Sequence, residues 1–417
     1  MFFQGLLILI LPILTSPATY GLISILLVNA NFAVLLTSGG IPSLLAYAAS
    51  KPSPSVTYIS HILKYSSIIQ LVIICIAEVV SVFIHDSFLI WPSNSYLAGL
   101  SGILLFTGIS YAEKQSGIYT GFLKAHLYYA RASIIGATQI VLLLLWFAFE
   151  TPGPETIPIY LLISGQLALV ILLQAAILKS NFLSAQGSSL NSFDLKSSWL
   201  FAFPVYLSNL LQFLAIRVDI WLVEYWLGIK QVGFYALSNQ LGQILMIIPM
   251  VLASLVFPLL NSGKMETKSF ERWIRLMNGI LWIVLLLGYI LSPIFIRVIW
   301  NNSYNESITP FLWALPGFFA RAQIAMYTAF FSARGYVRLN VVASLIGLLC
   351  LLSADAFLLP GWNIKGAAIG LSIAQMITAY WMIWIFNKKE GSTSFRLFPD
   401  RRDLQRIDLP KLINRFV

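Results

Sequence analysis

The sequence predicts an all-α membrane protein with about twelve transmembrane helices, in two six-helix lobes related by a pseudo-two-fold axis along the membrane normal. Hydrophobic residues make up 59% of the 417 residues and charged residues only 10%, with a mean hydropathy of +0.83. Apolar runs of about 20 residues, enough to cross ~30 Å of hydrocarbon as helices, follow one another along the chain. Because these runs are continuously apolar rather than alternating, a transmembrane β-barrel is excluded.

The first half of the chain contains six candidate spans. Residues 1–16 form a short apolar stretch that runs into small residues, as a signal peptide would, but no Lys or Arg precedes it. A signal peptide begins with a positive region, so we interpret this stretch as a first span, with cleavage as the alternative. The next five spans are predicted at 20–49, 59–84, 97–123, 132–149 and 157–178.

The second half contains six more spans, predicted at 199–227, 232–260, 274–296, 311–333, 339–359 and 367–386. Alternate loops carry most of the basic residues, whereas the loops between them contain just Lys230, Arg297 and Lys365. The basic face is cytoplasmic by the positive-inside rule. Both termini are therefore expected in the cytoplasm of a multi-pass plasma-membrane protein.

These spans divide the chain into four parts. We predict an N-terminal lobe at 1–186, a cytoplasmic linker at 187–198, a C-terminal lobe at 199–386 and a basic cytoplasmic tail at 387–417. The net charge of +10 is then mostly an orientation signal, and the tail is expected to lie near anionic headgroups. Membrane lipids are thus expected partners, and nucleic acid is not.

The motifs of common enzymes are missing from the sequence. Cys75 and Cys350 lie inside apolar runs, and the three histidines share no ligand spacing. There is no phosphate-binding glycine loop, no Gly-x-Ser-x-Gly and no His-Glu-x-x-His. We therefore expect no catalytic residues, no metal and no cofactor, and interpret the chain as a non-enzyme.

Short matches at a nearly constant offset indicate an internal repeat. The segment Ala132-Ser-Ile-Ile-Gly136 reappears as Ala343-Ser-Leu-Ile-Gly347, and Gly21 corresponds to Gly233. Each match stands at the head of equivalent spans. Because each half has an even number of spans, its copy enters the membrane from the same side, which predicts parallel repeats with a substrate site between them.

Several of these residues carry a family resemblance. The series Phe203-Pro204, Arg217-Val218-Asp219, Gly233-Phe234-Tyr235 and Phe257-Pro258 resembles the polysaccharide biosynthesis (Wzx-type) flippases of the multidrug/oligosaccharidyl-lipid/polysaccharide (MOP) exporter superfamily. In the first half, Tyr20-Gly21 and Gly39-Gly40-Ile41-Pro42 fit the same pattern. The resemblance implies alternating-access transfer of an undecaprenyl-pyrophosphate-linked oligosaccharide from the cytoplasmic to the outer leaflet of a bacterial inner membrane. A polysaccharide polymerase and a chain-length regulator are then possible partners.

Charged residues well inside the spans are the candidate site, because an ionised side chain near the bilayer centre costs at least ~3 kcal/mol. A guanidinium holds a pyrophosphate in bidentate fashion, so Arg217 and Arg321 are expected to bind substrate, with Lys114 as a less directional charge. The alternative is that each cation is neutralised by a buried acid and locks two helices. The charged residues in question are Glu78, Glu113, Lys114, Arg217, Asp219, Arg321 and Asp355.

The acids among them are candidates for taking up a proton or sodium ion that couples transport, namely Asp219, Glu113 and Glu78. Two positions apart on a helix, Arg217 and Asp219 should point to nearly opposite sides and should not share one site. Arg321 follows Pro316-Gly317, which is expected to bend or break its helix.

Two other functions remain open from the sequence. A cation-coupled multidrug exporter of the MATE type shares the twelve-span architecture, but it would need an acidic rather than a cationic cavity. A membrane polysaccharide polymerase usually needs a long extracytoplasmic loop, and the loops near 150–157 and 296–309 are too short to form a domain.

Overall fold

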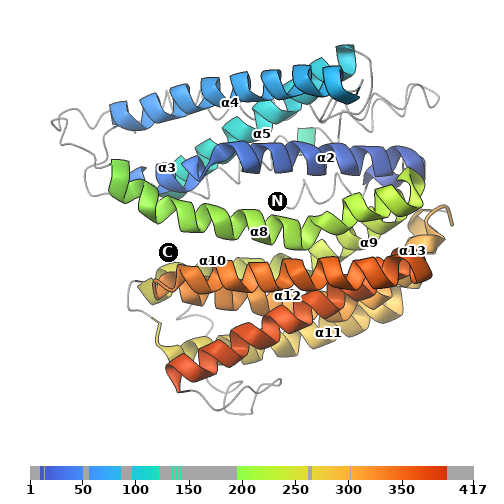
Figure 1. Cartoon of the computed structure of the whole chain (residues 1–417). Coiled ribbons are helices and arrows are strands. Elements are labelled where there is room, and N and C mark those ends of the chain that lie inside the picture. The colour runs from blue at the N-terminus through green and yellow to red at the C-terminus, as the bar shows by residue number, and fades with distance from the viewer. Residues whose placement is uncertain are drawn as a thin grey trace. The chain divides into compact units, whose positions relative to one another are not determined.

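A computed structural model describes residues 10–13, 15–49, 56–85, 96–121, 195–261, 265–300 and 302–391, with positions 134, 137, 138 and 141. Every regular element in these residues is a helix, as predicted (Figure 1). The chain forms two compact units, residues 1–237 and 238–417. The spans predicted at 132–149 and 157–178 and the tail beyond residue 391 fall outside the described ranges, as do most of the first span and the linker.

Two consecutive glycines divide the predicted span 20–49. Helix α2 (Pro17–Ser38) begins at Ser16, whose side chain accepts a hydrogen bond from the Thr19 backbone N–H at 3.2 Å, with proline in the first turn. It ends where Gly39 and Gly40 adopt φ values of 52° and 87°, a left-handed conformation that glycine adopts without steric cost. Helix α3 (Ile41–Ala49) follows. The continuous span predicted here is therefore two helices.

The remaining long helices of the first unit match their predicted spans closely. Helix α4 runs over Val56–His85, α5 over Tyr96–Gly121 and α8 over Leu195–Leu227. Helix α5 packs against α2, α3 and α4, while α8 packs against α2 and α3 (Figure 1). A cluster with Leu45, Ile59 and Ile118 at its centre joins α3, α4 and α5.

Two glycines allow α2 to touch helix α9 (Ile229–Leu245) at the backbone. A Cβ on Gly21 would overlap the Ile229 carbonyl oxygen and come within 2.9 Å of the Gly233 nitrogen, and one on Gly233 would overlap the Pro17 carbonyl oxygen. The repeat predicts that Gly21 and Gly233 are equivalent positions. Residues beside a two-fold axis contact their own equivalents, so this contact supports the proposed pseudo-two-fold.

The second unit contains α10 (Ile247–Asn261), α11 (Thr267–Ile299), the short η2 (Asn305–Ser307), α12 (Ile308–Ala333) and α13 (Val337–Glu390). Helix α12 packs against α10, α11 and α13 (Figure 1). At one end of α12 an aromatic cluster joins three helices through Phe270 of α11, Phe330 of α12 and Phe386 of α13, with ring centroids 4.6–5.7 Å apart.

The predicted spans 339–359 and 367–386 are the two arms of α13. Asn363 interrupts its helical backbone with φ 51° and ψ −145°. Similarly, the predicted span 232–260 is the pair α9 and α10, bent by 51°. Of the described helices, α2, α4, α8, α11 and α13 are long and apolar enough to cross a membrane, and the bent pair makes a sixth if counted as one span. The count of twelve remains a prediction.

At Pro316-Gly317, where the sequence predicts a bend or break, α12 is continuous but its hydrogen-bond ladder is altered. In a regular helix the Gly317 N–H would donate to the Trp313 carbonyl. Here it donates to the Ser372 hydroxyl at 3.2 Å, and that hydroxyl donates to the Trp313 carbonyl at 2.7 Å. The Ser372 side chain of α13 is thus inserted into the hydrogen-bond ladder of α12. Such an insertion is one of the recognised causes of helix bending.

Replacing Gly233 with alanine should destabilise the protein, because the added methyl group would overlap the backbone of α2. Overpacking of this kind costs about 1–3 kcal/mol, so the thermal unfolding midpoint in detergent should fall. Gly361→Ala is the matched control, since nothing lies within 4 Å of its new Cβ. Equal midpoints for the two variants would contradict the close contact between α2 and α9.

Candidate functional site

One stripe of α8 faces α2 and carries Arg217. The Phe213 ring stacks on Phe32 of α2 at a centroid distance of 6.0 Å, and Trp221 meets the same ring edge-on at 5.1 Å. The Trp221 indole N–H also donates to Asn29 Oδ1 at 2.7 Å. Positions 213, 217 and 221 recur every four residues, which places them on one helix face. Arg217 therefore stands between two aromatic contacts on the side of α8 that packs against α2.

Asp219 is fully buried and bound on both carboxylate oxygens. The Ile220 backbone N–H donates to Oδ1 at 2.8 Å, and the Tyr235 hydroxyl of α9 donates to Oδ2. A buried carboxylate needs such donors because it has lost its water. Asp219 thereby ties the end of α8 to α9 in the first unit.

Arg217 lies within electrostatic reach of this carboxylate, and the expectation that the two side chains serve separate sites stays a prediction. Its guanidinium interacts electrostatically with Asp219, Tyr20 and Tyr235. A helical wheel places only Cα atoms, whereas the long arginine side chain can reach around the helix. Asp219 is fully buried and the Arg217 residue as a whole is partly buried, with its guanidinium desolvated.

A second group of polar side chains is buried between α2, α4 and α5. The Ser110 hydroxyl donates to Gln70 Oε1 at 2.6 Å, and Gln70 Nε2 donates to Thr37 Oγ1 at 3.3 Å. Lys114 is fully buried, and its Nζ donates to Ser67 Oγ at 3.0 Å. We call this group the polar seam. Its hydrogen bonds join three helices, which favours the helix-locking interpretation of Lys114 over direct substrate contact.

Two of the acids predicted as coupling-ion candidates lie on the helices of this seam. Glu113 is partly buried on α5 and interacts electrostatically with Lys114, while Glu78 of α4 is almost fully buried. Within the described ranges no three His, Cys, Asp or Glu side chains gather as a metal site would require. A role of these acids in taking up a coupling ion stays a prediction.

Arg321 belongs to the second unit, one turn beyond the opened ladder of α12, and is partly buried. Two residues later, Gln323 Nε2 donates to Asn278 Oδ1 of α11 within the core. Asp355 of α13 is buried against Gly370, whose missing side chain leaves room for its carboxylate. The joint action of Arg217 and Arg321 on one substrate thus remains a prediction.

Several residues of the site were missed in the sequence. In the sequence, Tyr20 and Tyr235 stand out only as parts of motifs. The polar seam does not stand out there. A signal was present, since Ser67 and Gln70 on α4 and Ser110 and Lys114 on α5 are three or four positions apart and so share a helix face. Polar residues at that spacing inside an apolar span indicate a buried contact between helices.

Comparison with known proteins gives concordant results. The model of a family described as "Polysaccharide biosynthesis protein" matches residues 10–309. A curated relative from Shigella flexneri, named "Putative O-antigen transporter", is 25% identical over 186 residues, which are 43% of this chain and 44% of the relative. The match therefore spans less than half of that relative's length.

Solved structures share the fold at low identity. An inward-facing multidrug resistance MATE family transporter of the MOP superfamily has a TM-score of 0.64 at 12% identity, covering 94% of this chain and 95% of that one. The lipid II flippase MurJ, in an inward closed conformation, has a TM-score of 0.60 at 14% identity, covering 100% and 90%. A MOP superfamily transporter from Pyrococcus furiosus reaches 0.63 at 14% identity, covering 94% and 91%.

Removing the Tyr235 hydroxyl tests how much its hydrogen bond to the buried Asp219 carboxylate contributes to stability. Tyr235→Phe leaves Asp219 one donor short in a site without water access, and an unsatisfied buried group costs about 1–3 kcal/mol. We expect a lower thermal unfolding midpoint. The control is Tyr380→Phe, at a side chain that is 73% exposed. If both variants unfold at the wild-type temperature, the bond between α8 and α9 is unimportant.

Proposed function

The chain belongs to the polysaccharide biosynthesis protein family, and from this premise we propose that it transfers a lipid-linked oligosaccharide across the bacterial inner membrane. The relative named as a putative O-antigen transporter supports a polysaccharide cargo. The MOP transporter fold supports movement across a bilayer rather than catalysis. The proposed substrate is an undecaprenyl-pyrophosphate-linked oligosaccharide.

The observation that carries this proposal is the position of Arg217 on the α2 side of α8, inside an apolar span and within electrostatic reach of Asp219. A guanidinium offers five N–H donors in a planar fork that matches two phosphate oxygens at once. Asp219 accepts hydrogen bonds from Ile220 and Tyr235 and partly balances the charge of Arg217. Such a cation tolerates the hydrocarbon while empty and still holds a pyrophosphate when one arrives.

Direction and coupling complete the proposal. With the basic loops and both termini in the cytoplasm, the substrate enters from the cytoplasmic leaflet and leaves from the outer one. Two lobes rocking about the pseudo-two-fold would expose the site to each side in turn. Asp219, Glu113 and Glu78 are the proposed sites for a coupling proton or sodium ion. A polymerase and a chain-length regulator would then use the product on the outer side.

A second candidate function is cation-coupled export of small drugs, which the fold shared with a MATE transporter favours. The two functions differ in the charge required at the site. A drug cation is held by acids and repelled by arginine, whereas a pyrophosphate requires the arginine. Substitution of Arg217 therefore separates the two.

Arg217→Ala should lower transport of the lipid-linked oligosaccharide by about tenfold or more, because a charge-assisted hydrogen bond contributes about 1.5–3 kcal/mol. Arg217→Lys should retain part of the activity, since the charge remains but the bidentate geometry is lost. The measurement is surface polysaccharide in a host that depends on this protein. Arg321→Ala should lower transport to a similar extent if both arginines hold the same pyrophosphate group.

The matched control is Arg275→Ala, which removes an arginine paired with Glu271 one turn away on α11 at 3.9 Å. This variant should export normally. Amounts of inserted protein and unfolding midpoints must be equal across the set. Normal export by a stable Arg217→Ala protein would rule out its role in holding the pyrophosphate.

A further inference from the structure

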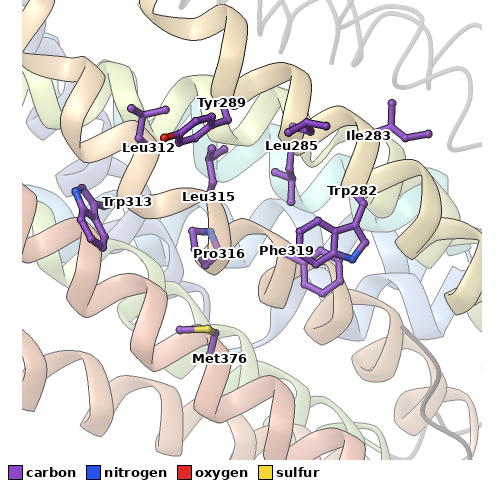
Figure 2. Close-up of a pocket in the computed structure, with 11 residues that line it drawn as sticks. Trp282, Ile283, Leu285, Tyr289, Leu312, Trp313, Leu315, Pro316, Phe319 and Met376 are labelled. Carbon is purple, nitrogen blue, oxygen red and sulfur yellow. The ribbon is translucent and has the colours of Figure 1, made fainter. Parts of the chain in front are cut away.

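An apolar groove with a volume of about 880 Å³ opens between α11, α12 and the second arm of α13. Figure 2 shows the Trp282 and Phe319 rings against each other at one end, with centroids 5.3 Å apart, and Trp313 at the other. Tyr289 and Leu315 line the middle, and Met376 lines it from α13 (Figure 2). All three helices belong to the second unit, so the groove is built within a single compact body.

The local structure of α12 shapes this groove. Trp313 and Pro316, which line it, lie in the stretch where Ser372 enters the helix ladder. Gly317 lets α13 approach closely, since a Cβ there would come within 2.8 Å of the Ser372 Cα. The hollow is thus fixed by backbone hydrogen bonds and close packing, as expected of a preformed binding site.

The groove opens on the outer surface of apolar helices. Trp282, Trp313 and Met376 are 45%, 48% and 44% exposed, and α11 is one of the helices apolar enough to span the bilayer. Water in such a groove would find few hydrogen-bond partners, because an apolar cavity does not hold ordered water. Hydrocarbon is the filling that this lining favours.

A lysine stands at the Trp313 end. The Lys365 Nζ lies 5.0 Å from the centre of the Trp313 ring and 5.3 Å from that of Trp362. The turn of α13 at Asn363 places this lysine at the end of a membrane-spanning arm, where headgroups lie. In the part of the chain that the structure describes, no carboxylate pairs with Lys365. Its charge is therefore available to an anion at the mouth of an apolar groove.

We propose that this groove binds an anionic glycerophospholipid, with one acyl chain between α11, α12 and α13 and its phosphate on Lys365. The Lys365 ammonium matches the lipid's phosphate, and the apolar lining of the groove matches its acyl chain. A polyprenyl chain is a poorer match, because it is several times longer than an acyl chain and the groove spans only the stretch between the Trp282–Phe319 pair and Trp313 (Figure 2). The site is separate from the proposed transport function and does not rest on it.

Native mass spectrometry of the detergent-purified full chain tests this proposal with phosphatidylglycerol and phosphatidylcholine of identical acyl chains. Lys365→Gln should lower phosphatidylglycerol occupancy about fivefold, the effect of losing one lysine's attraction to an anionic headgroup. It should lower phosphatidylcholine occupancy less, because the choline cation offsets the charge of that lipid's phosphate. Met376→Trp should lower the occupancy of both lipids, because the introduced indole is larger than the methionine side chain and fills the groove.

Two matched variants serve as controls. Ile377→Trp adds the same ring at the neighbouring position, which is similarly exposed but does not line the groove. Lys388→Gln removes another lysine that lies over a tryptophan, Trp384, outside the groove. Both should bind phosphatidylglycerol as the wild type does. The proposal is overturned if Lys365→Gln has no effect, if Met376→Trp has none, or if the controls lose as much lipid as the test variants.

Discussion

An ionised arginine inside a membrane-spanning helix is unfavourable unless nearby groups offset its charge, and the contacts around α8 reflect this constraint. Asp219 supplies the opposite charge, and Tyr235 and the Ile220 N–H in turn satisfy the carboxylate. Both charged groups are removed from water, so each depends on the polar groups around it.

Close backbone contact between α2 and α9 holds the same region together. Gly21 and Gly233 leave no space for side chains, and Trp221 and Phe213 of α8 fix the aromatic contacts to α2. Alternating access requires helices that keep their own packing while they tilt. The glycine contact, at positions that the repeat makes equivalent, keeps α2 and α9 at backbone contact distance.

The sequence predicted the helical membrane fold, the family and most helix positions, because these depend on long apolar runs and a few Gly and Pro residues. It says less where side chains reach across helices. A helical wheel separates Arg217 from Asp219 but takes no account of the length of the arginine side chain. The hydrogen bond from Lys114 to Ser67 joins two different helices, and a charge count cannot reveal it. The glycine pair that divides α2 from α3 was noticed, but its left-handed backbone became clear only in the structure.

The most direct test of this account measures access to position 217 from both sides of the membrane. Arg217→Cys would be introduced into a chain whose two natural cysteines, Cys75 and Cys350, are replaced by alanine. A charged thiol reagent that cannot cross the bilayer would then be applied to each face of oriented vesicles. The account predicts modification from both faces, with a cysteine at the buried position 219 protected. Protection of position 217 from both faces, or modification from one face alone, would contradict it.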